Sequence, residues 1–470
     1  METIATSAAP ATVPCREVTD RNGRAYRIGE TGRDLLGRPR WVMVLCPWIA
    51  MAGVSASAYA FAAAAPEGLR TSRLWSGGGA DFFWLTGVWV FCQAAVAFPA
   101  GQLRESGRLP ARDALLFGAA AALTGHVFLA YVPDPLLACL GFGTFGGIGT
   151  GLVYATCVST AGKWYPERKG GRTGLVGGGF AYGSVPFLSL LADYRDVGGG
   201  QREALVVVGA VCCVAVASAG RLVKDPPANW WPPHADPRKR PGPPGTVRDP
   251  EKNPPAVRQF TAREAARRPV LWMMWGCLLC TAGVHAFGAA MLVPLGTDMG
   301  FTGGALATAA SLNAVVNGTG CGVIGWMSDR CGRRKTLAVV CVLLGGAQFG
   351  TPASANTGNT PLFLACSTVA GLCGGAAFPL FAAMTADFFG ENHSAANYGI
   401  VHSAQLISGP LGSGLGAAVA VSAWSDEGAF ALAGGVGLLS ALLAVLLRRP
   451  GRLPVRKIQP NPYPISREAM

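Results

Sequence analysis

The stretch that decides the fold is Gly325-Trp326-Met327-Ser328-Asp329-Arg330-Cys331-Gly332-Arg333-Arg334-Lys335, a short basic turn between two apolar runs. The runs span residues 305–327 and 336–353, and each is close to the roughly 20 residues that cross a bilayer. A weaker copy, Gly101-Gln102-Leu103-Arg104-Glu105-Ser106-Gly107-Arg108, lies almost half a chain earlier. Two similar turns at this separation predict two homologous halves.

The chain as a whole has the composition of a membrane protein. Half of its 470 residues are hydrophobic and only 14% are charged, against roughly 25% in soluble domains. We therefore expect an all-α membrane protein with twelve transmembrane helices in two six-helix bundles. The expected spans are about 41–63, 83–103, 113–132, 135–160, 173–192, 204–220, 270–292, 305–327, 336–353, 361–385, 396–420 and 428–447.

Lysine and arginine alternate between the two sides of the expected membrane. All 39 lie outside the expected spans, 35 of them on the side that holds both termini and 4 on the other. Because positive residues are retained in the cytoplasm, we expect a multi-pass plasma (cell inner) membrane protein with both termini cytoplasmic. The net charge of +13 then reflects topology and attraction to acidic lipid, and we expect no nucleic-acid partner.

The polar segments divide the chain into five expected regions. These are a cytoplasmic N-terminal arm (1–40), a six-helix bundle (41–222), a cytoplasmic central linker (223–269), a second six-helix bundle (270–447) and a cytoplasmic tail (448–470). Proline and basic residues dominate the linker, so we expect it to be mostly extended or disordered and unable to bury a core. Near its end, Thr261 and Glu264 have the spacing of a capping box that begins a short amphipathic surface helix.

The sequence gives no sign of an enzyme or of a bound cofactor. It contains no phosphate-binding G-x-x-x-x-G-K-[ST] loop, and its polar residues assemble no nucleophile with a base and an orienting group. Of the 14 cysteines, only Cys15 and Cys331 lie outside the expected spans. The others serve as small apolar residues, and Cys277-x-x-Cys280 is interpreted as two neighbours on one helix face. We expect neither a metal site nor a disulfide framework.

Several further stretches carry a family resemblance. They are the glycine-rich run 143–151 followed by Tyr154, the loop Lys163-Trp164-Tyr165-Pro166-Glu167-Arg168-Lys169-Gly170, the segment Asp225-Pro226-Pro227-Ala228-Asn229-Trp230, and the runs Asn317-Gly318-Thr319-Gly320 and Asn397-Tyr398-Gly399. With the two basic turns, they resemble the major facilitator superfamily of secondary transporters and, within it, the oxalate/formate antiporter family. The resemblance implies the major facilitator fold and alternating access. It also implies a small carboxylate substrate, such as oxalate, formate, lactate or pyruvate, coupled to a proton or a counter-anion.

Two positions depart from that family. Members that handle carboxylates commonly have an arginine four residues after the asparagine that matches Asn317, and here that position is Cys321. The helix 11 lysine of the oxalate exchangers aligns with Gln405. Because an unpaired carboxylate is costly inside a membrane, either the substrate is neutral or zwitterionic, or a histidine supplies the positive charge.

Polar residues within the expected spans are the candidates for substrate binding. His285 and His402 can change charge near neutral pH and lie in helices that line the central cavity of the family's fold. His126 is interpreted as structural, and Asn313 shares a helix face with Asn317. The expected substrate-binding residues are Tyr154, Asn317, His285, His402, Gln405, Cys321, Tyr59 and Gln93.

The basic turns supply the candidates for gating. We expect Asp329, Arg330, Arg333 and Glu105 to form charge pairs that hold the cytoplasmic helix ends together in one state and release them in the other. The leading hypothesis is a secondary active transporter of a small organic acid. The alternatives are an exporter of a neutral or zwitterionic secondary metabolite or drug and, more remotely, a membrane sensor that does not transport.

Overall fold

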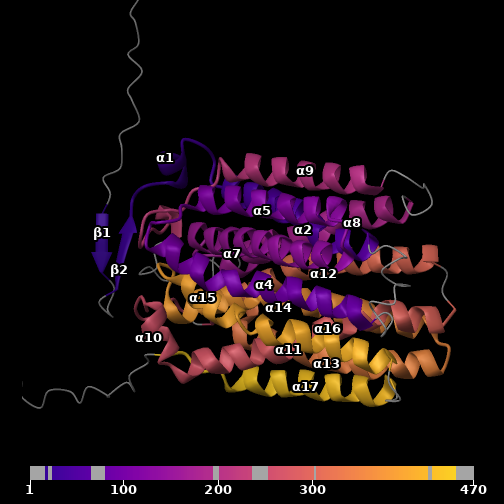
Figure 1. Ribbon diagram of the computed structural model, residues 1–470. Coiled ribbons are helices and arrows are strands. Elements are labelled where there is room, and N and C mark those ends of the chain that lie inside the picture. Colours follow the sequence, from indigo (N-terminus) through magenta and orange to yellow (C-terminus); the bar gives the residue numbers. More distant parts are fainter. Residues whose placement is uncertain are drawn as a thin grey trace, which may run out of the picture.

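The computed structural model describes residues 16–19, 24–64, 80–193, 201–235, 252–300, 303–421 and 426–450. Long helices that run roughly parallel to one another make up most of it (Figure 1). They are α2 (Val42–Ala64), α4 (Ala80–Glu105), α5 (Ala111–Tyr131), α6 (Pro135–Gly141) continued by α7 (Gly147–Trp164), α8 (Lys169–Asp193), α9 (Gln201–Gly220), α11 (Pro269–Asp298), α12 (Gly303–Cys331), α13 (Arg333–Asn356), α14 (Thr360–Phe389), α15 (Ser394–His402) continued by α16 (Gln405–Val421), and α17 (Asp426–Leu446).

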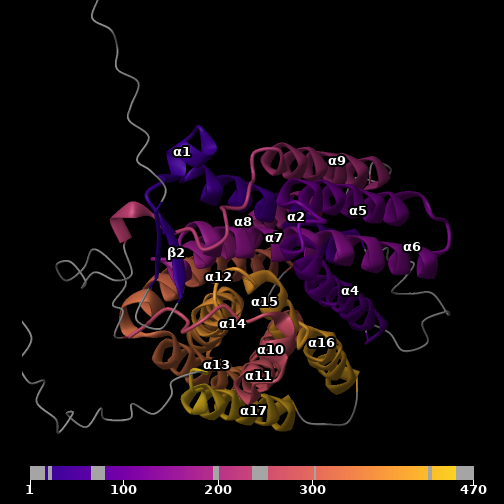
Figure 2. The ribbon, with the colours of Figure 1, turned by 90° about the vertical axis from the view of Figure 1, so that its left-hand side faces the viewer.

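These helices form two groups of six segments, one from each half of the chain. Seen from the end that holds the basic turns, α2 to α9 lie together above and α11 to α17 lie together below (Figure 2). Each expected span coincides with one helical segment, which confirms the twelve-helix prediction. Seven of the described helices are long and apolar enough to cross a membrane by length and composition alone.

Two of the twelve segments are interrupted. A π-helical turn, Phe142–Gly146, joins α6 to α7 within a glycine-rich stretch. Helix eleven breaks at Ser403 and Ala404, which form a turn between α15 and α16. Breaks of both kinds are frequent at functional sites because they free backbone groups and redirect side chains.

Glycines allow the two bundles to touch along α8 and α12. A Cβ at Gly174 would lie 2.1 Å from the carbonyl oxygen of Cys321, and one at Gly178 would lie 2.5 Å from that of Gly318. Gly170 lies one turn before Gly174 in α8, and a Cβ there would lie 2.4 Å from the carbonyl oxygen of Gly325. The spacing of four residues puts all three glycines on one face, so backbone meets backbone across the interface.

The second crossing joins α4 to α15 and α16. A Cβ at Gly101 would lie 2.7 Å from the backbone of Ala395, and one at Gly399 would lie 2.6 Å from the Cα of Phe98. Gly101 opens the first basic turn just as Gly325 opens the second. The two halves therefore use their matching turns in the same way, each against a helix of the other half.

The N-terminal arm and the central linker cover the basic end of the bundles. Strands β1 (Arg16–Thr19) and β2 (Ala25–Ile28) form an antiparallel hairpin, followed by the short helix α1 (Gly32–Leu36). The linker residues Trp230 and Trp231 are 3% and 4% exposed, and the Trp231 amide donates to the carbonyl oxygen of Arg27 in β2. Tyr26 packs edge-on against Trp231. The expectation that the linker buries no core is therefore wrong for residues 221–235.

Other parts of the linker match the expectation or extend it. The capping box of Thr261 and Glu264 is present and begins α10 (Ala262–Ala266). Asp225 accepts hydrogen bonds from the buried Arg104 at 2.8 Å and from the Thr160 hydroxyl at 2.8 Å, which ties the linker to α4 and α7. Burial would raise the pKa of Asp225, but Arg104 and Lys163 outweigh it and lower the pKa to about 2. Asp225 is therefore ionised at neutral pH, and it holds the linker against α4 and α7.

Candidate functional site

The centre of the molecule holds an aromatic cluster at the boundary between the two bundles. The Tyr154 ring from α7 stacks on the His402 ring from α15, with 5.2 Å between ring centroids and an interplanar angle of 17°. Tyr398 lies one turn before His402, at 5.3 Å between centroids. Tyr154 and His402 were both expected at the substrate site, and the structure brings them into direct contact across the bundle interface.

Hydrogen bonds assign the protonation of the neutral His402 ring. The Tyr398 hydroxyl donates to the carbonyl oxygen of Phe378 at 3.1 Å, so it accepts from His402 Nδ1, 3.3 Å away. The Gln405 amide nitrogen lies 3.2 Å from Nδ1 and 3.3 Å from Nε2, and with Nδ1 protonated it donates to Nε2. His402 and Gln405 flank the break in helix eleven, and a cation on the imidazole would require the Gln405 amide to turn.

The Tyr154 hydroxyl is the open end of this cluster. It lies near the Tyr398 hydroxyl, and it is buried without a hydrogen bond of normal geometry to the described residues. A buried hydroxyl that lacks a partner is costly, so this position favours a ligand or a water molecule that accepts from it. The Cys321 thiol donates weakly to the Asn317 side chain at 3.7 Å.

Two other expected residues rest against glycines of α14 and not against the central cluster. A Cβ at Gly375 would lie 1.9 Å from the side-chain oxygen of Asn317, and one at Gly374 would lie 2.0 Å from Nδ1 of His285. The Phe378 ring lies between His285 and His402, at 6.5 Å and 6.2 Å between centroids. The two candidate histidines therefore occupy different compartments.

The remaining candidates are less informative. The Tyr59 side chain lies outside the described residues. Gln93 is buried in α4, where its backbone carbonyl packs against Gly151 of α7. His126 is fully buried with Nδ1 2.8 Å from the carbonyl oxygen of Ala122. It packs within the first bundle, in agreement with a structural role.

A chain of alternating charges closes the basic end of the molecule. Asp387 accepts from Lys169 at 2.9 Å and from Arg333 at 3.0 Å, and each of these three side chains is at most 1% exposed. Arg333 continues to Asp329 at 2.6 Å. In the other direction Lys169 continues to Glu391, which also binds Arg24 of the N-terminal arm. We call these six residues the gate network; it balances three cations against three carboxylates.

The gate network connects parts of the chain that are far apart in sequence. Lys169 begins α8 in the first half, Asp387 and Arg333 belong to the second half, and Arg24 comes from the arm. Burial would raise the pKa of Glu391, but Arg24 and Lys169 outweigh it and lower the pKa to about 2. Glu391 is therefore ionised at neutral pH. Any movement that separates the bundles at this end must break buried ion pairs, such as that between Lys169 and Asp387.

The acidic residue of each basic turn caps a helix of the opposite bundle. Asp329 accepts from the backbone amides of Gly170 and Gly171, at 3.1 Å and 2.7 Å, at the start of α8. Glu105 accepts from the amide of Ala396 at 3.0 Å, at the start of α15. A carboxylate is favourable at a helix N-terminus, where amides are unpaired and the dipole is positive. Glu105 of the first basic turn therefore caps a helix of the other bundle, as Asp329 of the second turn does.

Arg330 differs from the other expected gating residues. It is exposed and lies over the ring of Trp326 on its own helix, 4.0 Å from the centroid. Sequence reasoning missed Lys169, Asp387, Glu391 and Arg24 as members of this network. Asp387 was placed just beyond the tenth span, whereas it lies inside α14 near its end. A carboxylate that directly follows a long apolar run was the available signal.

The described residues contain no group of three or more histidine, cysteine, aspartate or glutamate side chains arranged to hold a metal ion. A small cavity of about 10 Å³ separates the aromatic cluster from the gate network and is lined by residues of both bundles, including Tyr398 and Lys169. It has room for about one water molecule. The passage between the central cluster and the basic end is therefore closed.

Comparison with known proteins supports a transporter. The chain is 28% identical over 375 residues to the oxalate:formate antiporter of Oxalobacter formigenes, covering 77% of this chain and 84% of that protein. It is 26% identical over 406 residues to apicoplast pyruvate carrier 1 of Toxoplasma gondii, covering 76% and 71%. A shorter match of 156 residues, 32% identical, joins it to human monocarboxylate transporter 11 and covers 32% of each chain.

Solved structures share the fold. The human organic anion transporter MFSD10 superposes with a TM-score of 0.64 at 12% identity, over 87% of this chain and all of that one. The fucose:proton symporter FucP of Escherichia coli superposes with a TM-score of 0.61 at 14% identity, over 87% and 98%. A model of the Major Facilitator Superfamily matches residues 47–359 and 322–467. This multi-pass membrane protein is not an enzyme, and it belongs to the Major Facilitator Superfamily of small-molecule transporters.

Proposed function

We propose that this transporter is a secondary active carrier of a small organic carboxylate, which it moves between the two bundles by alternating access. The observation that carries the proposal is the stack of Tyr154 on His402 at the break in helix eleven. One partner comes from each half of the chain, so a ligand bound there contacts both halves. Differential contact of this kind is what lets a substrate shift a two-state equilibrium.

The cluster offers the groups that a carboxylate needs. A protonated His402 would present its Nε2–H, and the Tyr154 hydroxyl has no hydrogen bond of normal geometry to compete for it. Gln405 would turn its amide to complete the set. Charge-assisted hydrogen bonds to a carboxylate are about twice as strong as neutral ones, which offsets part of the cost of taking the anion out of water.

This arrangement accounts for the two missing cations. The family positions that match Cys321 and Gln405 carry no charge here, and Gln405 lies beside the His402 ring. We propose that His402 replaces them as the positive partner, so binding requires a proton on the imidazole. The printed names of the relatives, which include oxalate, formate and pyruvate, support a small carboxylate as the substrate.

We further propose that the basic end faces the cytoplasm, because it holds most of the lysines and arginines. On this assignment the gate network closes the cytoplasmic side. The linker 223–269 then joins a first bundle, 41–222, to a second, 270–447, and the protein resides in the plasma membrane. Opening toward the cytoplasm would separate Lys169 from Asp387 and release the Asp329 cap.

Counterflow in proteoliposomes tests this function. Vesicles loaded with unlabelled oxalate, formate, lactate or pyruvate should take up the same labelled compound, faster at about pH 5.5 than at about pH 7.5 because His402 must be protonated. His402→Gln should abolish the uptake. The matched control, His126→Gln, removes a buried histidine that packs inside the first bundle and should leave the uptake unchanged.

The alternative substrate class gives a different outcome. If the unaltered protein moves none of the four carboxylates, but Cys321→Arg or Gln405→Lys does, the site is built for a neutral or zwitterionic compound and the exporter hypothesis takes over. Carboxylate uptake that is indifferent to both pH and His402→Gln would contradict the role assigned to the histidine.

A further inference from the structure

A second cavity lies inside the second bundle, away from the bundle interface. It is enclosed by α11, α12, α13, α14 and α17 and has a volume of about 30 Å³. A water molecule needs roughly 10–15 Å³ by this measure, so there is room for about two. We call this cavity the side chamber.

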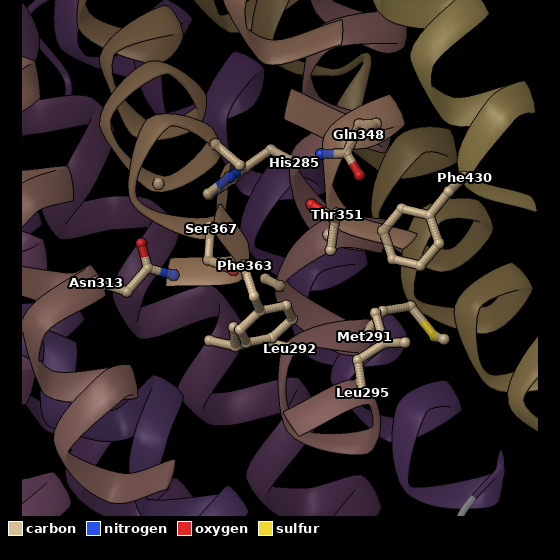
Figure 3. A pocket seen from close by; sticks show the side chains of 14 residues that line it. His285, Met291, Leu292, Leu295, Asn313, Gln348, Thr351, Phe363, Ser367 and Phe430 are labelled. Carbon is tan, nitrogen blue, oxygen red and sulfur yellow. The ribbon is translucent and has the colours of Figure 1, made fainter. Parts of the chain in front are cut away.

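The side chamber is polar at one end and apolar at the other. Figure 3 shows His285, Gln348, Thr351 and Ser367 at the polar end, and Met291, Leu292, Leu295 and Phe363 at the apolar end. The apolar residues of α11 follow His285 in the direction away from the basic turns. The polar end therefore lies at middle depth, and apolar side chains line the chamber beyond it.

Two acceptor atoms in the chamber lack partners. The side-chain oxygens of Asn313 and Gln348 are both buried without a hydrogen bond among the described residues, and Gln348 is only 1% exposed. An unsatisfied buried carbonyl oxygen is costly. Because both unsatisfied atoms are acceptors, they favour hydrogen-bond donors such as water or a protonated imidazole.

Glycines of α14 leave room for the side chains of Asn313 and His285. A Cβ at Gly371 would lie 1.6 Å from the side-chain oxygen of Asn313, and one at Gly374 would lie 2.0 Å from Nδ1 of His285. The two polar groups therefore occupy notches that any other residue at these positions would fill. His285 and Asn313 reach the chamber because α14 has no side chains there.

The chamber adjoins the central cluster through a single aromatic ring. Phe378 meets His285 edge-on at 66° and His402 edge-on at 67°. The carbonyl oxygen of Phe378 also accepts from Tyr398. Phe378 therefore contacts both histidine rings, His285 on the chamber side and His402 in the central cluster.

We propose that the side chamber is the coupling site of the transporter, which holds ordered water and one proton on His285. The inference rests on the proposed function, because it assigns a driving ion to the carboxylate carrier: His402 keeps its proton through the cycle, and the proton on His285 is the one that crosses with the substrate. A proton from water on one side of the membrane binds the neutral imidazole, and the enclosed water accepts a hydrogen bond from the imidazolium and donates to the Asn313 and Gln348 oxygens. The same proton leaves to the other side after the bundles rearrange.

The surroundings of His285 contain no competing charge among the described residues. None of the chamber-lining residues is a carboxylate, lysine or arginine. The polar side chains that line the chamber around His285 are Asn313 from α12, Gln348 and Thr351 from α13 and Ser367 from α14. One turn before His285, Thr281 contacts the Cys341 thiol of α13 and Ser440 of α17. The His402 ring lies on the other face of Phe378, and the Cys373 thiol beside Gly374 belongs to an apolar cluster with Val284 and Val340.

Two transport modes separate coupling from substrate binding. Purified protein in phosphatidylethanolamine–phosphatidylglycerol vesicles is assayed with labelled pyruvate, first in counterflow at equal pH and then as net uptake into a lumen one pH unit more alkaline. One proton per pyruvate allows accumulation of about tenfold over the external concentration, and empty vesicles measure the passive entry to be subtracted. An enclosed pH dye should report proton entry with pyruvate.

The expected result is a selective loss. His285→Gln and Gln348→Met should each reduce accumulation to less than about twofold and abolish the dye signal, while counterflow falls by no more than about threefold. His126→Gln should retain both modes. Gln348→Met keeps the side-chain volume, so it tests the chamber separately from the imidazole.

Several results would overturn the inference. A proton site in the chamber is excluded if the unaltered protein exchanges pyruvate but does not accumulate it. It is also excluded if His285→Gln still accumulates pyruvate, or if accumulation is driven by sodium and not by protons. Loss of counterflow together with accumulation in His285→Gln would place His285 in the substrate site. If the unaltered protein exchanges none of the carboxylates, the proposed function fails first, and the inference fails with it.

Discussion

Replacing Asp387 by asparagine should open the basic end of the molecule. The Asp387 carboxylate is fully buried between Lys169 at 2.9 Å and Arg333 at 3.0 Å. Asparagine has almost the same shape but no charge, so the change removes one carboxylate from a network that otherwise balances. The closed state loses two buried charge pairs, and an open state in which water reaches both cations loses little.

The magnitude follows from the remaining partners. Removing one member of a buried ion pair costs about 3–5 kcal/mol. Lys169 keeps Glu391 and Arg333 keeps Asp329, so the lower value of about 3 kcal/mol applies. That energy changes the ratio of closed to open molecules by about 150-fold. A population that is 99% closed would then become mostly open.

Distances between spin labels measure this shift. Ser106→Cys and Lys335→Cys place one label in the basic turn of each half, where both residues are exposed, with Cys15 and Cys331 replaced by serine. The short distance of the closed state should give way to a longer one in Asp387→Asn. The matched control is Asp34→Asn, which changes an exposed aspartate in the N-terminal arm. An unchanged distance distribution in Asp387→Asn would refute the view that these ion pairs hold the bundles closed.

Three further outcomes are expected. Tyr154→Phe should weaken carboxylate affinity by about 10–100-fold through loss of one hydrogen bond to a charged group, while the control Tyr182→Phe should not; equal affinities would place the substrate elsewhere. For Glu391, whose pKa neighbouring cations lower from 4.5 to about 2 despite burial, the stabilisation is complete above about pH 4.5 and is lost as the pH falls through about 2. The melting temperature should therefore fall more steeply over that interval in the unaltered protein than in Glu391→Gln, and parallel curves would contradict this. Gly174→Val should cost about 1–3 kcal/mol of bundle contact, because its Cβ would lie 2.1 Å from a carbonyl oxygen of α12. It should slow counterflow at least tenfold, whereas Gly276→Val, whose Cβ would make only an ordinary contact 4.0 Å from Leu443, should be tolerated.

Much of the gate could be predicted from the sequence, because its parts belong to a local motif. Asp329 and Arg333 are four residues apart and meet on consecutive helices, so their pairing follows from the turn itself. The partners Lys169, Asp387 and Glu391 could not be predicted as a set, because they come from the start of α8, the end of α14 and the turn that follows α14. Only the packing of the bundles brings them together.

The central site was likewise predicted in part from the sequence and decided in part by helix packing. Composition identified Tyr154 and His402 as polar groups in apolar helices, which is enough to mark them as candidates. It did not separate His402 from His285, because both are histidines at middle depth. Their difference arises from Phe378, which lies between the rings, and from the α14 glycines, which hold His285 on the far side.

The sequence by itself determined the twelve membrane helices, the two-fold repeat and the family. Those properties follow from hydrophobic length, from charge alternation and from motifs that lie within a few residues of one another. Only the tertiary structure decided that the linker tryptophans are buried, that Arg24 of the arm completes the gate network, and that the side chamber exists. Each of these depends on contacts between segments far apart in the chain. Such contacts are fixed by the packing of whole helices and leave no local pattern in the sequence.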